Sequence, residues 1–308
     1  MKNRFYLIGI LILIFCANAF GQLVLPRESQ RAEVTQIVGD TKVTIVYHRP
    51  NIRGRKVWGE APTNASSNAT TLDTNNRPAD APLVAYGHVW RTGANENTTF
   101  EISNDVKING QTLPAGKYGL HTIPTQNEWT VIFSKINNAW GSFTYNPKDD
   151  QLRITAKPQK GEFQESMWIG LENIKATTAD VVIRWENVRL PFTIDVGDVR
   201  GRTLANIRQH IANLKADDFR TPITGANWIL SEKMTANYEE ALGWVDKSLS
   251  IRETFGGLSA KAQILAAMGK KQEAIASAEK AIQVGKAANP PANTANLERM
   301  LADWKAGK

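Results

Sequence analysis

Short runs of β-branched and aromatic residues, several of them alternating with polar positions, fill roughly the first two thirds of the chain. Clusters of Gly, Pro, Asn and Asp separate these runs, and no helical spacing of apolar residues interrupts them. Such runs predict β-strands. The clearest strands are expected over residues 43–47, 99–102, 129–133, 152–155, 167–171 and 181–185. About nine strands without intervening helices predict an antiparallel β-sandwich or barrel.

One turn of this β region is specified by its residue types. Asn109 and Gly110 separate the apolar runs 106–108 and 112–113. Both central residues of a type I′ turn need a positive φ, which Asn and Gly adopt most readily. We therefore predict a two-residue β-hairpin at this point.

From about residue 199 the apolar positions follow helical spacing. Four of them lie three or four residues apart, namely Leu204, Ile207, Ile211 and Leu214. This spacing predicts a helix over residues 203–216. Thr221 followed by Pro222 is typical of the start of a further helix, and Gly269 is typical of the end of a later one.

The helical region also contains a repeat. The segment 238–242 (YEEAL) recurs 33 residues later as 271–275 (KQEAI). A period near 34 residues with alanine at the helix crossing is typical of tetratricopeptide repeats, which residues 225–287 resemble. Because such arrays usually need three units or more, helices over 203–216 and 292–305 are expected to cap the two units. Small residues should let the paired helices approach closely, namely Ala241, Ala262, Ala274 and Ala281. A plain helical bundle without a binding groove is the alternative.

Composition changes at the same place as the periodicity. Six of the nine Trp and ten of the thirteen Pro precede residue 198, as expected for strands and turns. The remainder is rich in Ala, Lys, Gln and Glu, which favour helices. We therefore predict a β domain over residues 22–198 and a helical domain over residues 199–308.

The start of the chain has the features of a secretory signal peptide. Two basic residues precede an apolar run over residues 5–17, and an A-x-A cleavage pattern ends at Ala19. Residues 1–21 are therefore predicted to be a signal peptide, removed after Ala19 or Gly21. A membrane anchor is the alternative, but the run is shorter than the roughly 20 residues that span a bilayer. Lipid attachment at Cys16 is a second alternative, although a bulky residue precedes this cysteine.

Removal of the signal peptide would leave a mature chain without cysteine, because Cys16 is the only one. Disulfides, thiol catalysis and cysteine metal sites are then excluded together. Export would place the protein in the periplasm or outer cell envelope of a Gram-negative bacterium, with no transmembrane segment in the mature chain.

Residues 60–82 interrupt the strand pattern. This segment is rich in Asn, Thr, Ser, Ala and Pro, and Leu72 is its only large apolar residue. Because so little apolar surface cannot order a segment, we predict a flexible surface insertion.

The net charge of +7 raises the question of an anionic partner. Residues 22–198 carry 19 basic and 19 acidic residues and are neutral, whereas residues 199–308 carry 16 and 11. The excess therefore lies on the predicted helices, where solvated charged faces are the usual explanation. Since export also separates the protein from nucleic acid, a nucleic-acid partner is not expected.

Two segments carry candidate binding chemistry. In residues 86–96, Trp90, Arg91, Asn95 and Glu96 supply a stacking surface, a planar cation, an amide and a carboxylate. This set would suit a small polar ligand or a glycan. The alternative is a structural Arg-Glu pair and a Trp that hold a loop in place.

The second segment, residues 47–59, contains four basic residues within eight positions. Arg49 and Arg55, with Trp58 beside them, would suit the carboxylate or phosphate of an anionic ligand. Solvated charges on a hairpin are the alternative.

Catalytic and metal patterns are weak. The sequence has no nucleophile elbow, zinc-protease motif, P-loop or dinucleotide glycine pattern. His48, His88, His121 and Glu96 include the residue types of a metal or acid-base site, but their spacings match no ligand motif. We therefore predict no metal and no cofactor.

Five stretches in order carry a family resemblance: residues 48–59 (HRPNIRGRKVWG), 86–100 (YGHVWRTGANENTTF), 108–124 (INGQTLPAGKYGLHTIP), 129–145 (WTVIFSKINNAWGSFTY) and 181–187 (VVIRWEN). Over about residues 26–195 the chain resembles domain of unknown function 2911 (DUF2911), a secreted bacterial family common in the Bacteroidetes. The segment 60–82 departs from the more compact family pattern. The resemblance implies an envelope location, a β-rich fold and a helical C-terminal extension, and it implies no activity.

These observations predict a secreted envelope protein that binds rather than catalyses. The β domain would bind a small polar or anionic ligand or a glycan, and the helical domain a protein or peptide. The alternative is an envelope enzyme of hydrolase type that acts on a glycan or peptide through Arg91, Glu96 and His121.

Overall fold

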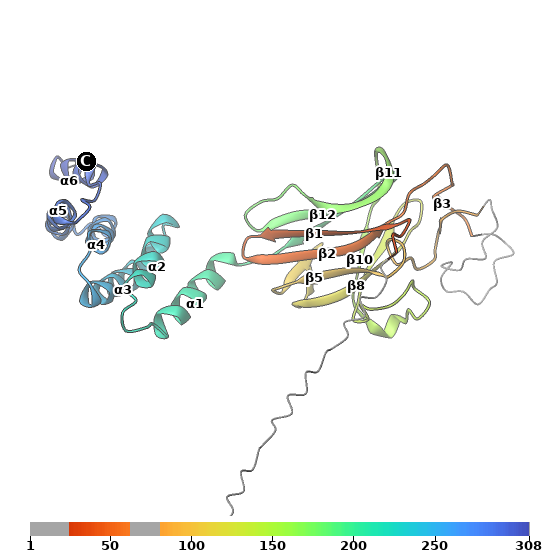
Figure 1. Ribbon diagram of the computed structural model, residues 1–308, viewed down its shortest axis with the longest axis horizontal. Coiled ribbons are helices and arrows are strands. Elements are labelled where there is room, and N and C mark those ends of the chain that lie inside the picture. Colours follow the sequence, from red (N-terminus) through yellow and green to blue (C-terminus); the bar gives the residue numbers. More distant parts are fainter. Residues whose placement is uncertain (1–24, 62–80, 308) are drawn as a thin grey trace, which may run out of the picture. The chain divides into compact units, whose positions relative to one another are not determined.

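The computed structural model describes residues 25–61 and 81–307 (Figure 1). The predicted signal peptide with Cys16 and most of the predicted insertion at 60–82 lie outside these residues. The chain divides into two compact units. The β unit comprises residues up to 37, 42–174 and 179–195, and the helical unit comprises residues 38–41, 175–178 and those from 196 onward.

The larger sheet of the β unit has six strands in the order β1-β2-β5-β8-β9-β10. Their bounds are β1 Gln30–Val38, β2 Thr41–Arg49, β5 Thr98–Ile102, β8 Gly116–Ile123, β9 Trp129–Ser134 and β10 Asp150–Ala156. The pairs β2/β5, β5/β8, β8/β9 and β9/β10 are antiparallel. Chain neighbours β8, β9 and β10 therefore form a meander.

The second sheet has four strands in the order β11-β12-β6-β7. Their bounds are β11 Gln159–Glu172, β12 Thr178–Asp195, β6 Val106–Ile108 and β7 Gln111–Leu113. Figure 1 shows β11 and β12, in green, in a layer apart from β5 and β8. The short strands β3 (Trp58–Gly59) and β4 (Val84–Ala85) pair in parallel.

The hairpin predicted at Asn109 and Gly110 is confirmed. Ile108 pairs with Gln111, and the φ angles of Asn109 and Gly110 are 45° and 83°. Both angles are positive, as a type I′ turn requires.

An antiparallel β region followed by helices is also confirmed, with one difference in the number of strands. The described residues contain twelve strands rather than about nine, and their open sheets exclude the closed barrel, one of the two predicted alternatives. Three of the strands are β1, β3 and β4, which carry little apolar periodicity. β3 and β4 have two residues each, and most of the edge strand β1 is exposed, so its sequence needs few apolar positions.

Four tryptophans form an aromatic cluster in the core. Trp58 lies 4.9 Å from Trp129 and 5.6 Å from both Trp90 and Trp185, measured between ring centroids. Trp90 stacks on Trp185 at 5.7 Å. All four are buried, and Trp129 and Trp185 belong to the two different sheets. Each such contact contributes about 0.5–1.5 kcal/mol beyond area burial, so the cluster stabilises the joining of the two layers.

Strand alternation determines which side chains face outward from the six-stranded sheet. In β2, Val43, Ile45 and Tyr47 are buried in the core. Val46 and His48 alternate with them and therefore lie on the outer face. Val46 pairs with Thr99, and Thr99 pairs with Gly119, so the outer face continues across β5 and β8.

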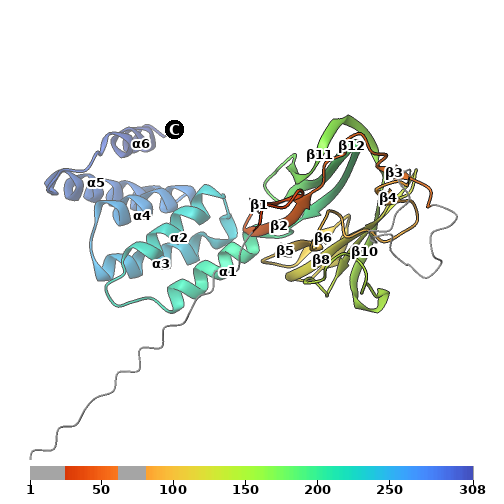
Figure 2. The same cartoon turned by 45° about the vertical axis from the view of Figure 1, so that its right-hand side comes forward.

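The helical unit contains six described helices. Their bounds are α1 Val199–Ala212, α2 Arg220–Ser231, α3 Tyr238–Ile251, α4 Phe255–Ala267, α5 Lys271–Ala287 and α6 Ala295–Lys305. From α2 to α6 each helix packs against the next one in the chain, and Figure 2 shows α2 to α5 side by side. The helix predicted over 203–216 begins and ends four residues earlier. Gly269, with φ 79°, lies just after α4 as predicted.

Alanines occupy the close contacts between these helices. The four expected to do so are at most 1% exposed: Ala241, Ala262, Ala274 and Ala281. Two apolar clusters result, one around Trp244 and Ile264 and the other around Leu258 and Leu297. Each cluster joins several helices, so the helical unit has cores of its own.

Within residues 25–61 and 81–307, no helix is both long and apolar enough to cross a membrane.

Candidate functional site

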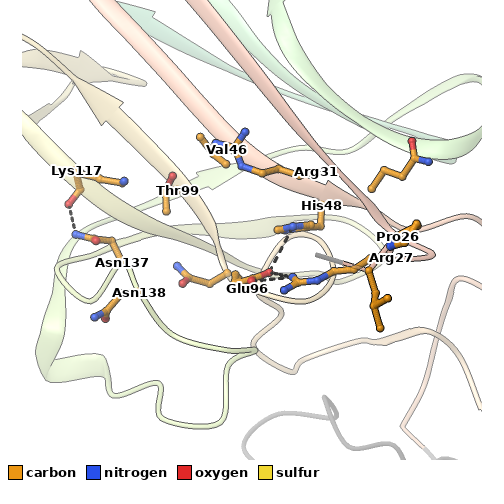
Figure 3. A pocket seen from close by; sticks show the side chains of 13 residues that line it. Pro26, Arg27, Arg31, Val46, His48, Glu96, Thr99, Lys117, Asn137 and Asn138 are labelled. Carbon is orange, nitrogen blue, oxygen red and sulfur yellow. Dashed lines mark hydrogen bonds and ion pairs between the residues drawn. The ribbon is translucent and has the colours of Figure 1, made fainter. Parts of the chain in front are cut away.

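A cavity of about 640 Å³ lies on the outer face of the six-stranded sheet (Figure 3). This volume is within the usual range for small-molecule sites, about 300–1,000 Å³. Ten of its thirteen lining residues have polar or charged side chains: Leu25, Pro26, Arg27, Gln30, Arg31, Val46, His48, Glu96, Asn97, Thr99, Lys117, Asn137 and Asn138. The cavity therefore offers both charged groups and amides to a ligand.

Four neighbouring strands supply the base of the cavity through their outward positions. Arg31 comes from β1, Val46 and His48 from β2, Thr99 from β5 and Lys117 from β8. Because cross-strand partners share a face of the sheet, the alternation that buries the core also gathers these side chains.

An ion pair connects the segment before β1 to the base of the cavity. Arg27 Nη1 donates to both oxygens of the Glu96 carboxylate, at 2.8 and 2.7 Å. This contact holds the pKa of the Glu96 carboxyl below its usual range. About half of each side chain is exposed, so solvent weakens the attraction. Glu96 is therefore a carboxylate at neutral pH.

His48 lies on the other side of Glu96, with 3.4 Å between His48 Nε2 and Glu96 Oε2. Burial lowers the pKa of the imidazole, and the nearby carboxylate opposes this effect only in part. His48 is then neutral at neutral pH and contributes no charge to the cavity.

Two further cations, Arg31 and Lys117, line the cavity. Arg31 forms a 2.8 Å ion pair with Glu33, and both of these side chains are about half exposed. Lys117 faces Glu101 across the β5/β8 pair. Figure 3 shows Lys117 and Asn137 well apart from the Arg27, Glu96 and His48 group. With Arg27 included, the lining has three cations and one carboxylate, spread over the wall.

The loop between β9 and β10, residues 135–149, closes one side of the cavity. The backbone N–H of Asn97 donates to the Ala139 carbonyl at 3.0 Å. The side-chain amide of Asn137 donates to the Lys117 carbonyl at 2.9 Å. Gly119 makes this close approach possible, because a Cβ atom there would lie 2.2 Å from the Ile136 carbonyl oxygen. The loop therefore adds amide groups to the cavity wall.

Asn97 is a buried amide in the cavity wall, and it is incompletely satisfied. Its Nδ2 donates to the Thr98 carbonyl at 3.1 Å. Its Oδ1 is buried and has no hydrogen-bond partner among the described residues. Because this oxygen is itself buried, it is not accessible to a ligand, and leaving it unpaired costs stability.

The candidate binding residues of segment 86–96 do not come together in the structure. Only Glu96 lines the cavity. Trp90 is in the core and donates from Nε1 to the Gly93 carbonyl at 3.0 Å, while Arg91 is partly buried beside the same carbonyl. Asn95 donates to the Ser29 carbonyl at 3.1 Å.

The basic segment 47–59 also has structural contacts. Arg49 donates to the Met167 carbonyl at 2.8 Å and so ties β2 to β11. Arg55 donates to the carbonyls of Asn51 and Ile52 within its own loop. Trp58 belongs to the core cluster. These three residues are not part of the cavity lining.

His121 lies on the same outer face as Gly119 but beneath the loop 135–149. Its Nδ1 is 3.1 Å from Ser142 Oγ, and only 3% of the residue is exposed. Burial lowers its pKa to about 4. His121 is therefore a neutral, buried histidine away from the cavity lining.

Sequence reasoning missed Arg27, Arg31, Lys117 and Asn137 as cavity residues. They come from three separate stretches of chain, and no short motif contains more than two of them. The available signal was positional, because Lys117 lies two residues from Gly119 and four from His121 on one strand face. Strand pairing was needed to connect that face to β1.

In the part of the chain that the structure describes, no group of three or more His, Cys, Asp or Glu side chains is placed to hold a metal ion.

Fold and site together define a two-layered, mainly antiparallel β protein with a polar cavity on the outer face of one sheet. The chain belongs to the family described as "Protein of unknown function (DUF2911)", whose model matches residues 29–194. This match covers the strands of both larger sheets and ends at the last residues of β12. No curated protein and no solved structure matches the chain.

Proposed function

We propose that the β unit is a non-catalytic binding module whose cavity takes a small anionic ligand. The observation that carries the proposal is the lining, in which Arg27, Arg31 and Lys117 accompany a single carboxylate, Glu96. Amide side chains in the same wall would hold the polar groups of the ligand. A ligand pocket with a few placed charges and amides fits this arrangement.

The contacts of the acidic and basic groups favour binding over catalysis. Glu96 is held by Arg27, which keeps the pKa of its carboxyl low and removes it as a general acid at neutral pH. His121 is buried and does not line the cavity. The enzyme alternative through Arg91, Glu96 and His121 thus has only Glu96 at the cavity.

A binding measurement with matched probes tests this proposal. Calorimetric titrations would compare small organic carboxylates and phosphates with their neutral amides or esters. We expect the anions to bind more tightly, and we expect their affinity to fall as salt is raised. Equal binding of charged and neutral probes, or no binding of either, would overturn the proposal.

We also infer that the helical unit is a short tetratricopeptide-like array that binds a protein or peptide. Helices α3 and α5 begin at Tyr238 and Lys271, 33 residues apart, which supports a repeat of this length. The large apolar residues that are exposed in the described part of the chain all belong to the β unit. A partner of the helical unit would therefore be recognised mainly by polar contacts.

The test uses the full chain and peptides of defined charge. The full chain would be immobilised. Because its helices carry excess positive charge, it should retain acidic peptides more strongly than basic peptides of equal length. No difference between the two sets would contradict a charged helical docking surface.

Export by residues 1–21 is likewise proposed, together with an envelope location. Fractionation of bacterial cells and sequencing of the mature N-terminus would test it. Cleavage after Ala19 or Gly21 is expected, and an intact N-terminus in the cytoplasm would contradict it.

A further inference from the structure

An exposed tryptophan lies next to the cavity. Trp140 is 54% exposed. The Arg27 guanidinium lies over its ring, 5.6 Å from the centroid, and its backbone forms a β-bridge with Glu96. Arg27 and Glu96 both line the cavity, so Trp140 lies immediately beside the site rather than elsewhere on the unit.

The anchoring of Trp140 indicates a rigid platform. The Gly141 amide N–H donates to the Asn95 carbonyl at 3.2 Å, next to the 3.0 Å bond from Asn97 to Ala139. Backbone contacts on both sides of residue 140 hold it in place while more than half of the side chain faces solvent. The anchored backbone and the Arg27 guanidinium over the ring reduce the conformational entropy that this side chain loses when a ligand stacks on it.

Three kinds of recognition therefore meet in one place. The exposed ring of Trp140 suits the apolar face of a flat ligand, and the cations suit an anionic group. The amide side chains of Asn137 and Asn138, which line the cavity, suit hydroxyl groups. Simple anions have no stacking face and few hydroxyls, so they would leave most of these features unused.

We propose that the ligand is an acidic saccharide of more than one ring. One ring, with its carboxylate or sulfate, would occupy the cavity near Arg31 and Lys117, and the next would stack on Trp140. The separation of Lys117 from the Arg27 and Glu96 group favours such an extended ligand over a compact ion. This proposal rests on the proposed anion-binding function and names its ligand class.

The experiment compares saccharides of equal length on the full chain. A galacturonic acid trimer, a sulfated galactose trimer and a neutral galactose trimer would be titrated by calorimetry, with acetate and inorganic phosphate as simple anions. We expect at least one acidic trimer to bind about tenfold or more tightly than the neutral trimer and than either simple anion. The better of the two acidic trimers identifies the anionic group.

Substitutions of the exposed ring test the platform. Trp140→Ala should weaken binding of the acidic trimer about tenfold, whereas Trp140→Phe should largely retain it because a stacking face remains. Phe163→Ala is the matched control, since Phe163 is 62% exposed on β11 and does not line the cavity. Equal effects of Trp140→Ala and Phe163→Ala would overturn the platform.

The failure modes of the two proposals are distinct. If acetate or phosphate binds as tightly as every trimer, the cavity is an anion site and the saccharide proposal is wrong. If the neutral trimer binds as tightly as the acidic ones, the anionic requirement is wrong. If no anion and no saccharide binds, both proposals fall.

Discussion

The β unit and the helical unit use their charged residues differently. In the helical unit, cations pair with acids on neighbouring helices, as in the 2.7 Å pair between Arg208 and Glu240 and the 2.6 Å pair between Lys305 and Glu279. In the neutral β region, Arg27, Arg31 and Lys117 line a cavity, where Arg27 is paired with Glu96 and Arg31 with Glu33. Net charge is therefore a poor guide to where an anion binds, because cations also gather locally in a region that is neutral as a whole.

The two units also differ in how they are stabilised. Large aromatic rings fill the core of the β unit, whereas alanines at the helix contacts let the helices of the other unit pack closely. Since each unit has its own core, we expect each to unfold in a transition of its own. Five predictions test this contrast, in order of decreasing effect.

Removal of a central ring should have the largest effect. Trp58 and Trp90 pack against the ring of Trp185, so Trp185→Ala would leave a cavity beside them. Such changes cost about 3–5 kcal/mol of unfolding free energy. Thermal unfolding followed by near-UV circular dichroism should show a lower transition for the β unit and an unchanged helical transition. Trp140→Ala is the control, because that ring is exposed. A shift of both transitions would show that the units unfold together.

Acid should destabilise the β unit through His121. Its pKa is about 4 in the folded protein and about 6.5 when unfolded, so the unfolded state binds a proton first as pH falls. Stability is therefore full above pH 6.5 and falls between pH 6.5 and about 4, by about 3 kcal/mol in total. Denaturant unfolding at several pH values across this range measures the loss of unfolding free energy.

Two variants isolate that histidine. His121→Gln should reduce the pH dependence between pH 6.5 and 4, and His48, whose pKa burial also lowers, supplies part of what remains. Substitution of the exposed His210 on α1 is the control. An unchanged slope in His121→Gln would assign the acid sensitivity to other groups.

Enlarging a helix contact should destabilise the helical unit alone. Ala262 is fully buried on α4 among residues of α5 and α6, so Ala262→Leu would overpack this contact and cost about 1–3 kcal/mol. Far-UV circular dichroism, which follows secondary structure, should show a lower transition temperature for the helical unit. The same enlargement at the exposed Ala205 should have little effect, and equal losses at both positions would argue against close packing.

Neutralising the cavity cations should affect binding more than stability. The double variant Arg31→Gln, Lys117→Gln should lower the affinity for an anionic ligand about tenfold and should reduce its salt dependence. Lys160→Gln, an exposed cation on β11, is the control. Equal affinity of the double variant and the control in a calorimetric titration would place the anion elsewhere.

The smallest effect is expected from the ion pairs between helices. Arg208→Gln breaks the exposed pair with Glu240, and exposed pairs contribute about 0–1 kcal/mol. Denaturant unfolding should show a change within this range, and anion binding by the β unit should be unchanged. A larger loss would mean that these pairs act as a network.

Local patterns were sufficient for many of the elements. Alternation located β2 and β9, and Asn109 with Gly110 located the β6/β7 hairpin, because turn geometry depends on the φ angles of two adjacent residues. The same reasoning gave too few strands, since the edge strand β1 is mostly exposed and needs little apolar sequence.

Local density of polar residues was a weaker guide to the site. Trp90, Arg91 and Asn95 attracted attention as neighbours in the chain, yet their side chains point to core and loop contacts. Glu96 alone reached the cavity. Residues 91–95 form an irregular loop in which Thr92 and Asn95 have positive φ angles, so closeness in sequence does not place their side chains together.

The sequence by itself determined the strand and helix periods, the hairpin turn, the family and the change from strands to helices near residue 199, because these depend on short-range spacing and residue type. Tertiary structure decided which side chains meet. Strand order placed Arg31, His48 and Lys117 on one face, and the loop 135–149 brought Trp140 beside Arg27. Such juxtapositions follow from pairing between distant segments, which no single stretch of sequence encodes.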